Sequence, residues 1–216
     1  MSGKDESLFS KSALMGTKPG KQIIKQGLFK SKGFKQFNQY KQEAEDTFPA
    51  FAQRFAKNLF AQINADDSPN TTQQQFGEEV GSTEIILNAS EIEPIKSKLQ
   101  DFDTLHDRVL RILNSNFVKM TFPVFNGLFD ASTDYFKDDK NPTMREDIVD
   151  GHIIAIDLSE PMDRIVDKDE DLEYLDDYKL MNPYILKLAR EKISKGGDNV
   201  LKEFEEGFKQ ARIGQY

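Results

Sequence analysis

The residues whose types and spacing could carry out chemistry in this chain are mainly carboxylates. Asp147 and Asp150 lie three positions apart, as do Asp157 and Glu160. Two carboxyl groups in a cleft can act as general acid and general base when their surroundings separate their pKa values. Residues 138–177, however, contain fifteen acidic residues, so pairs at this spacing also arise by chance. The pairs alone therefore predict no particular reaction.

Two other segments match ligand-binding loops only in part. The alternating carboxylates of residues 167–171 begin like a calcium loop, but Leu172 stands where the loop needs glycine and Tyr178 where it needs a bidentate glutamate. Gly16–Lys21 approaches a phosphate-binding loop, but it is one residue short and Gln22 replaces the residue that would bind magnesium. We predict a solvated acidic face, or a surface for basic partners, in the first segment and a flexible turn in the second.

The chain contains no cysteine and two histidines, His106 and His152. Disulfides, thiolate metal sites and cysteine nucleophiles are therefore excluded. A histidine-based triad is not expected, because the spacing indicates no nucleophile with an adjacent base. Each histidine is predicted to be a hydrogen-bonded structural residue. We therefore predict that the chain is not an enzyme and uses no cofactor or metal ion.

Charge is distributed unevenly along the chain. The 216 residues carry a formal net charge of −8, but residues 1–44 contain nine lysines and three acidic residues. This segment therefore carries +6, which leaves −14 for the remainder. Such separation favours attraction between the basic segment and an acidic surface of the same or a neighbouring chain.

Residues 1–44 are predicted to form a flexible or extended basic arm. Aromatic residues alternate with lysines in its later part, and Gly27 and Gly33 argue against one long helix there. A large aromatic ring gains about 1.5–3 kcal/mol when another surface buries it. The candidate partner-binding residues belong to this arm and to the start of the helix that follows it: Phe29, Lys30, Lys32, Phe34, Lys35, Phe37, Tyr40, Phe48, Phe51 and Phe55.

Residues 45–65 are predicted to form an aromatic amphipathic helix, because apolar side chains recur every three or four positions from Phe48 to Ile63. Its apolar stripe is interpreted either as part of the core or as a face that docks on a partner. Residues 66–83 are rich in Ser, Thr, Asn, Gln and Gly, which predicts a polar linker.

Residues 84–216 are predicted to form an acidic α+β body. A long helix with heptad spacing is expected from about residue 90 to Leu113. Alternating apolar residues predict a strand at 117–125, a turn at 126–127 and a second strand at 152–158. A helical hairpin is expected at the end of the chain, from Asn182 and Pro183 through two glycines to a last helix at Asp198. The expected fold class is therefore α+β, mainly helical, with a small β element and an extended basic arm.

These features together favour a non-catalytic structural subunit of a large homo- or hetero-oligomeric complex, whose arm binds neighbouring protein subunits. Phage connector, tail and capsid-associated proteins often have this plan, so a virion component is one expectation. The alternative is a nucleic-acid-associated protein that binds through the lysine- and phenylalanine-rich arm. The arm contains no arginine and the remainder would repel a polyanion, which favours the protein partner.

The sequence also bears on location. No stretch is long and apolar enough for a membrane span, and the first residues lack the hydrophobic segment of a secretion signal. No membrane partner is therefore expected. We expect a cytoplasmic chain, or one within a virus particle assembled in the cytoplasm.

Overall fold

The computed structural model describes residues 32–113, 121, 123–129, 146–156, 162 and 174–215, and the regular structure in these ranges is helical. The prediction of a mainly helical chain is therefore confirmed. The elements are α3 (Lys32–Ala65), α4 (Pro69–Val80), α5 (Ala89–Leu99), α6 (Phe102–Leu113), α9 (Leu175–Ile193), the 3-10 helix η2 (Ser194–Gly196) and α10 (Asp198–Gln215), together with helices at residues 123–129 and 146–156.

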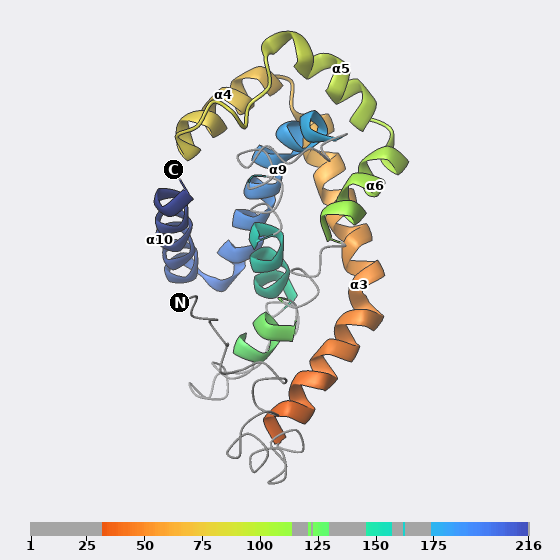
Figure 1. Cartoon of the computed structure of the whole chain (residues 1–216), viewed down its shortest axis with the longest axis vertical. Helices are drawn as coiled ribbons and strands as arrows, with labels where there is room; N and C mark the ends of the chain where they lie inside the picture. The colour runs from red at the N-terminus through yellow and green to blue at the C-terminus, as the bar shows by residue number, and fades with distance from the viewer. Residues whose placement is uncertain are drawn as a thin grey trace, which may run out of the picture.

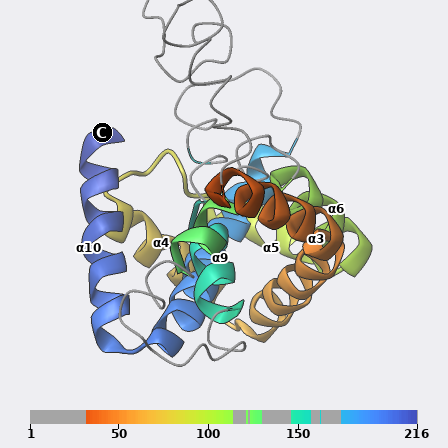
Figure 2. The ribbon, with the colours of Figure 1, turned by 90° about the horizontal axis from the view of Figure 1, so that it is seen from below.

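The core is built around α9, which lies in the middle of the other helices (Figure 1). It contacts α3, α4, α5 and α10, and Figure 2 shows it between α3 and α10 when the molecule is seen from below. Residues on all sides of α9 are buried, among them Tyr178, Leu180, Ile185 and Leu186. Burial all round is typical of a helix that its neighbours enclose. Removal of this apolar surface from water supplies most of the stabilisation of the fold.

α3 is one continuous helix of 34 residues, with an ideal length of about 51 Å. Its later part is the predicted amphipathic helix, which packs against α6 and α9. The helix begins at Lys32, however, so residues 32–44, which we expected to be flexible or extended, are helical. Gly33 does not prevent this, because it lies in the first turn of the helix, where it interrupts little.

The predicted polar linker at residues 66–83 contains α4. Pro69 opens this helix, where its missing N–H costs no intrahelical bond, and Gly81 ends it in the left-handed conformation with φ of 72°. Phe76 and Val80, four positions apart, face the core. The linker prediction is therefore wrong for α4. The helical spacing of Phe76 and Val80 was missed because the residues around them are mostly polar.

The predicted heptad helix is two helices, α5 and α6, which are separated at residues 100–101. The Asp101 carboxylate accepts hydrogen bonds from the Thr104 N–H (3.1 Å) and hydroxyl, and so caps α6. The apolar seam nevertheless faces the core across the break, with four fully buried positions: Ile92, Leu99, Val109 and Leu113. The predicted heptad spacing is thus carried by two helices, and the prediction of one continuous helix is wrong.

The described residues contain no β-strand, so the predicted β element is wrong where it can be compared. Residues 123–129, which include the expected turn at 126–127, are helical, as are residues 146–156, where the second strand should begin. Val149 and Ile153 are buried four positions apart, so the apolar residues at 152–156 belong to a helical period that begins before them. Residues 117–120, 122 and 157–158 lie outside the described residues.

The predicted helical hairpin at the end of the chain is present as α9 and α10, which contact each other. Gly197, with φ of 98°, lets the chain reverse between them. α9 begins at Leu175 and not at the expected Asn182 and Pro183, which both lie buried inside it. The buried helix α9 tolerates Pro183 because a side chain of another helix bonds the carbonyl that the proline leaves without its helical partner.

That compensation comes from Gln73 of α4. Pro183 has no N–H with which to bond the carbonyl of Lys179 four positions earlier. The buried Gln73 amide donates to this carbonyl instead (2.9 Å), and its oxygen accepts from the Leu87 N–H (3.3 Å). One side chain thus connects α4, α9 and the segment before α5.

Candidate partner-binding site

α3 combines an anchored part and a projecting part. From Phe51 to Ile63, its inward positions are buried in the core. Before Phe51, the described side chains are those of residues 39, 42 and 46–50, and they are exposed except for the partly buried Phe48. Figure 1 shows the first turns of α3 extending beyond the other helices. We call residues 32–47 the projecting segment; the anchored part of the same helix fixes its direction.

Five of the predicted partner-binding residues lie on the projecting segment: Lys32, Phe34, Lys35, Phe37 and Tyr40. Two others, Phe29 and Lys30, lie outside the described residues. The structure therefore places part of the predicted site on a regular helix and not on a flexible arm.

The remaining predicted residues belong to the core of the chain itself. Phe51 and Phe55 are each 1% exposed, and their ring centroids lie 6.2 Å apart in a stacked arrangement. Phe48 packs at the edge of the same cluster, with its ring centroid 6.5 Å from that of Phe51. Phe51 and Phe55 are thus not available to a partner, and the core interpretation of this stripe is correct.

The projecting segment continues the apolar face of the anchored part. Positions 34, 37, 41, 44 and 48 alternate spacings of three and four and lead directly to positions 51 and 55. This heptad spacing places them on one face of the helix. Sequence reasoning missed Lys41 and Ala44 as members of this face, because it treated residues 1–44 as non-helical. The unbroken spacing was the signal that could have found them.

The candidate acid pair Asp147 and Asp150 does come together, in an ion-pair cluster that joins three helices. Lys192 of α9 places its Nζ 3.0 Å from the Asp147 carboxylate and 3.7 Å from that of Asp150. Arg54 of α3 lies 3.2 Å from Asp150 and 2.6 Å from Glu146. Both cations are thus engaged by carboxylates, and among the described residues no group of acidic or histidine side chains is arranged to hold a metal ion. Asp157 and Glu160, the other candidate pair, lie outside the described residues.

Asp150 should be the least stabilising member of this cluster. Burial raises its pKa, although Lys192 and Arg54 act in the opposite direction. Its contribution to stability is therefore present below the unfolded-state pKa and is lost as the pH rises through the folded-state pKa. We expect Asp150→Asn to leave the free energy of unfolding unchanged or higher at neutral pH, because each cation keeps another carboxylate.

Urea unfolding of this variant at neutral and mildly acidic pH would test the expectation. Asp147→Asn is the matched control, because it removes the nearest carboxylate from Lys192 and should lower stability, by at most about 1 kcal/mol. A clear loss of stability at neutral pH for Asp150→Asn would show that its ion pairs outweigh its burial.

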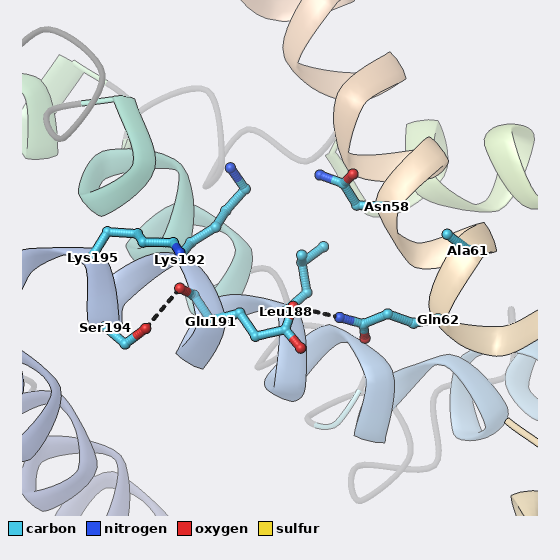
Figure 3. Close-up of a pocket in the computed structure, with 8 residues that line it drawn as sticks. All are labelled: Asn58, Ala61, Gln62, Leu188, Glu191, Lys192, Ser194 and Lys195. Carbon is cyan, nitrogen blue, oxygen red and sulfur yellow. Dashed lines mark hydrogen bonds between the residues drawn. The ribbon is translucent and has the colours of Figure 1, made fainter. Parts of the chain in front are cut away.

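A cavity of about 510 Å³ opens between α3 on one side and α9 with η2 on the other (Figure 3). Two hydrogen bonds join polar groups of its lining, and the buried Gln62 Oε1 has no hydrogen-bond partner. Gln62 donates to the Glu191 carboxylate (2.9 Å), and the Ser194 hydroxyl donates to the Glu191 carbonyl (2.9 Å). Because the Ser194 hydroxyl is bonded to a backbone carbonyl and not to a base, it is not activated as a nucleophile.

Asp177, at the end of the acidic run, is a core residue. Its carboxylate accepts from Lys98 (2.7 Å) and from the buried Arg108 (2.7 Å). The Arg108 guanidinium also lies over the Tyr174 ring, 3.7 Å from its centroid. Asp177 is therefore not part of a solvated face, whereas its neighbour Asp176 is exposed. Residues 167–173 lie outside the described residues.

Both histidines have structural surroundings. His152 Nδ1 lies 2.8 Å from the Ile148 carbonyl, and its ring stacks on Phe125 and meets the edge of Phe204. His106 stacks on Phe102, with ring centroids 5.8 Å apart. The contacts of His152 include the predicted hydrogen bond, whereas the contact described for His106 is aromatic stacking.

Comparison of the chain with protein-family models, with curated proteins and with solved structures gives no match. In the part of the chain that the structure describes, no helix has the length and apolar character needed to cross a membrane.

Proposed function

We propose that this chain is a non-catalytic assembly subunit that binds neighbouring protein subunits through the projecting segment of α3. The observation that carries this proposal is that α3 is one helix, anchored by its later part and extended beyond the body by its first. A helix held in this way meets a partner with little loss of conformational freedom, which lowers the cost of association.

The composition of the segment supports a protein partner. Phe34 and Phe37 occupy the face that, further along the helix, forms the core. Large aromatic anchors of this kind supply much of the binding energy at protein interfaces. A structural subunit of a larger particle, such as a virion, would use such a docking helix to bind its neighbours.

The alternative, binding of nucleic acid, would depend on lysines and not on the apolar face. Lys32 and Lys35 lie on the segment, whereas the chain beyond residue 44 carries −14 and would repel phosphate groups. Salt separates the two cases. Association through buried phenylalanines should persist as salt rises, whereas binding to phosphates should weaken steeply.

The proposal is tested by the size of the native species in extracts of cells that make the chain. We expect the wild-type chain to elute in a particle much larger than its own 24.7 kDa, and the Phe34→Ser/Phe37→Ser variant to elute as a small species. Lys32→Gln/Lys35→Gln is the matched control and should have the smaller effect. A larger effect of the lysine changes would favour nucleic acid, and a small wild-type species would contradict the proposal.

A further inference from the structure

We propose that α10 is a strap that opens as a unit about a hinge at Gly197 while the core of the chain stays folded. This inference goes beyond the proposed function and does not depend on the projecting segment. Three observations lead to it: the shallow burial of α10, the position of the hinge, and the nature of the contacts that hold the helix closed.

The first observation is that α10 is buried less deeply than the helix it packs against. From Asp198 to Gln210, where its side chains are described, none is buried, whereas α9 buries residues on all its sides. The apolar residues Leu201, Phe204 and Phe208 are each only partly buried. Figures 1 and 2 both show α10 at the edge of the molecule, on the side away from α3. Detachment of α10 therefore exposes much less apolar surface than unfolding of the core, and costs less free energy.

The second observation places the hinge at the second of two adjacent glycines. Gly196 is fixed against the body, because a Cβ there would lie 2.8 Å from Ile148 Cδ1. A Cβ at Gly197 would meet nothing within 4 Å, so no neighbouring group crowds this residue. Its backbone, with φ of 98° and ψ of 167°, lies in a region that glycine alone adopts without strain. Rotation of the backbone at Gly197 therefore moves α10 without displacing side chains packed against the hinge.

The third observation concerns the contacts that close the strap. Arg190 of α9 donates to both oxygens of the Glu205 carboxylate, from Nε at 2.6 Å and from Nη2 at 2.9 Å. The same guanidinium bonds Glu79 of α4 (3.1 Å), so it keeps a carboxylate partner when α10 leaves. The Phe204 ring meets the His152 ring edge-on, with centroids 6.0 Å apart. Opening therefore does not leave Arg190 unpaired, which lowers the cost of separation.

Opening has a consequence that can be measured. An isolated helix of 18 residues is only marginally stable in water, and Gly207 in the middle of α10 weakens it further. The released segment therefore loses its helical hydrogen bonds, and its backbone amides exchange with solvent. Amide hydrogen exchange of α10 thus reports the opening of the strap.

Amide exchange of the purified full-length chain, under conditions where the rate reports the opening equilibrium, tests the inference. We expect residues 202–210 to be protected at least about 100-fold less than residues 185–193 of α9, with similar protection along the helix. Equal protection of α10 and α9 would overturn the inference, because α10 would then open only when the whole chain unfolds. Protection that declines steadily toward residue 215 would also overturn it, since that pattern indicates fraying from the end.

A core substitution in α3 separates local opening from global unfolding. Ile63 is fully buried, so Ile63→Val should speed the exchange of α9 amides by about two- to tenfold. It should leave the exchange of α10 amides unchanged, because residue 63 stays packed in the open form. Equal acceleration in both helices would overturn the inference.

The contact that closes the strap is tested by a pair of matched variants on α10. Glu205→Gln weakens the bond to Arg190 and should speed the exchange of α10 amides by about two- to fivefold. Glu203→Gln makes the same change at an exposed position of the same helix and should change this exchange by less than about twofold. Equal effects of the two variants would overturn the role of the Arg190–Glu205 pair as the closing contact.

Discussion

Replacement of Arg108 by leucine is expected to lower the free energy of unfolding by about 3–5 kcal/mol. The Arg108 side chain is 9% exposed and bonds the carboxylate of Asp177, which is 4% exposed. Without the guanidinium, this carboxylate keeps only the Lys98 ammonium and stays buried with incomplete compensation. Chemical denaturation monitored by circular dichroism measures the loss.

Arg111→Leu is the matched control for this prediction. Arg111 also lies over the Tyr174 ring and bonds Asp107, but its side chain is 50% exposed, so its removal should cost less than about 1 kcal/mol. The double variant Arg108→Leu/Asp177→Leu should be less damaging than Arg108→Leu alone, because no buried charge is then left unpaired. Equal losses for Arg108→Leu and Arg111→Leu would mean that burial of the ion pair is not the cause.

Gln73→Leu is expected to cost about 2–4 kcal/mol, because it leaves two backbone groups buried without partners, at about 1–3 kcal/mol each. These groups are the Lys179 carbonyl, which Pro183 cannot bond, and the Leu87 N–H. The explanation predicts coupling between distant positions. In a Pro183→Ala background, the new N–H of residue 183 can bond the Lys179 carbonyl, so Gln73→Leu should cost about 1–3 kcal/mol less there.

Thermal and urea unfolding of the four chains in this cycle give the coupling energy. Gln74→Leu, an exposed neighbour on α4, should change stability by no more than about 0.5 kcal/mol and serves as the control. Additive effects of the Gln73 and Pro183 changes would show that the two residues do not compensate for each other.

Helices could be predicted from the sequence where the apolar spacing of three and four extends over many residues. The stripe of α3 and the terminal hairpin followed from apolar spacing and from the Gly196-Gly197 stop. The errors arose where a local feature opposed the period. Asp101 breaks the heptad seam by capping a new helix, and the composition of residues 66–83 hid α4 between Pro69 and Gly81. In both cases the sequence contains the residue that marks the helix end: Asp101 before α6 and Gly81 after α4.

The β element was a different error, because residues 152–158 fit either period over so short a window. Only the buried Val149, upstream of the expected strand, extends the pattern far enough to favour a helix. Tertiary links such as Gln73 to Lys179 were not predictable, because a polar residue in a helix gives no indication of which distant backbone group it reaches. The same holds for Arg108 and Asp177, which are 69 positions apart.

The candidate partner-binding residues were selected on an expected arm that the structure does not show over residues 32–44. Phe34, Phe37 and Tyr40 were selected as anchors on an extended arm, whereas they lie on the projecting segment of a helix. A helix from Lys32 into the core, with Pro49 inside it where the projecting and anchored parts meet, replaces the expected arm over residues 32–44. Its later phenylalanines, Phe51 and Phe55, serve the core and no partner.

Amide hydrogen exchange along α3 in the native assembly tests the central claim most directly. If a neighbouring subunit covers the projecting segment, amides of residues 32–47 should exchange slowly in the assembled wild-type chain and fast in the Phe34→Ser/Phe37→Ser variant. Amides of residues 51–63, which lie in the core, should be protected in both. Equally fast exchange of residues 32–47 in the assembly and in the variant would contradict the claim that this segment is where the chain binds its neighbours.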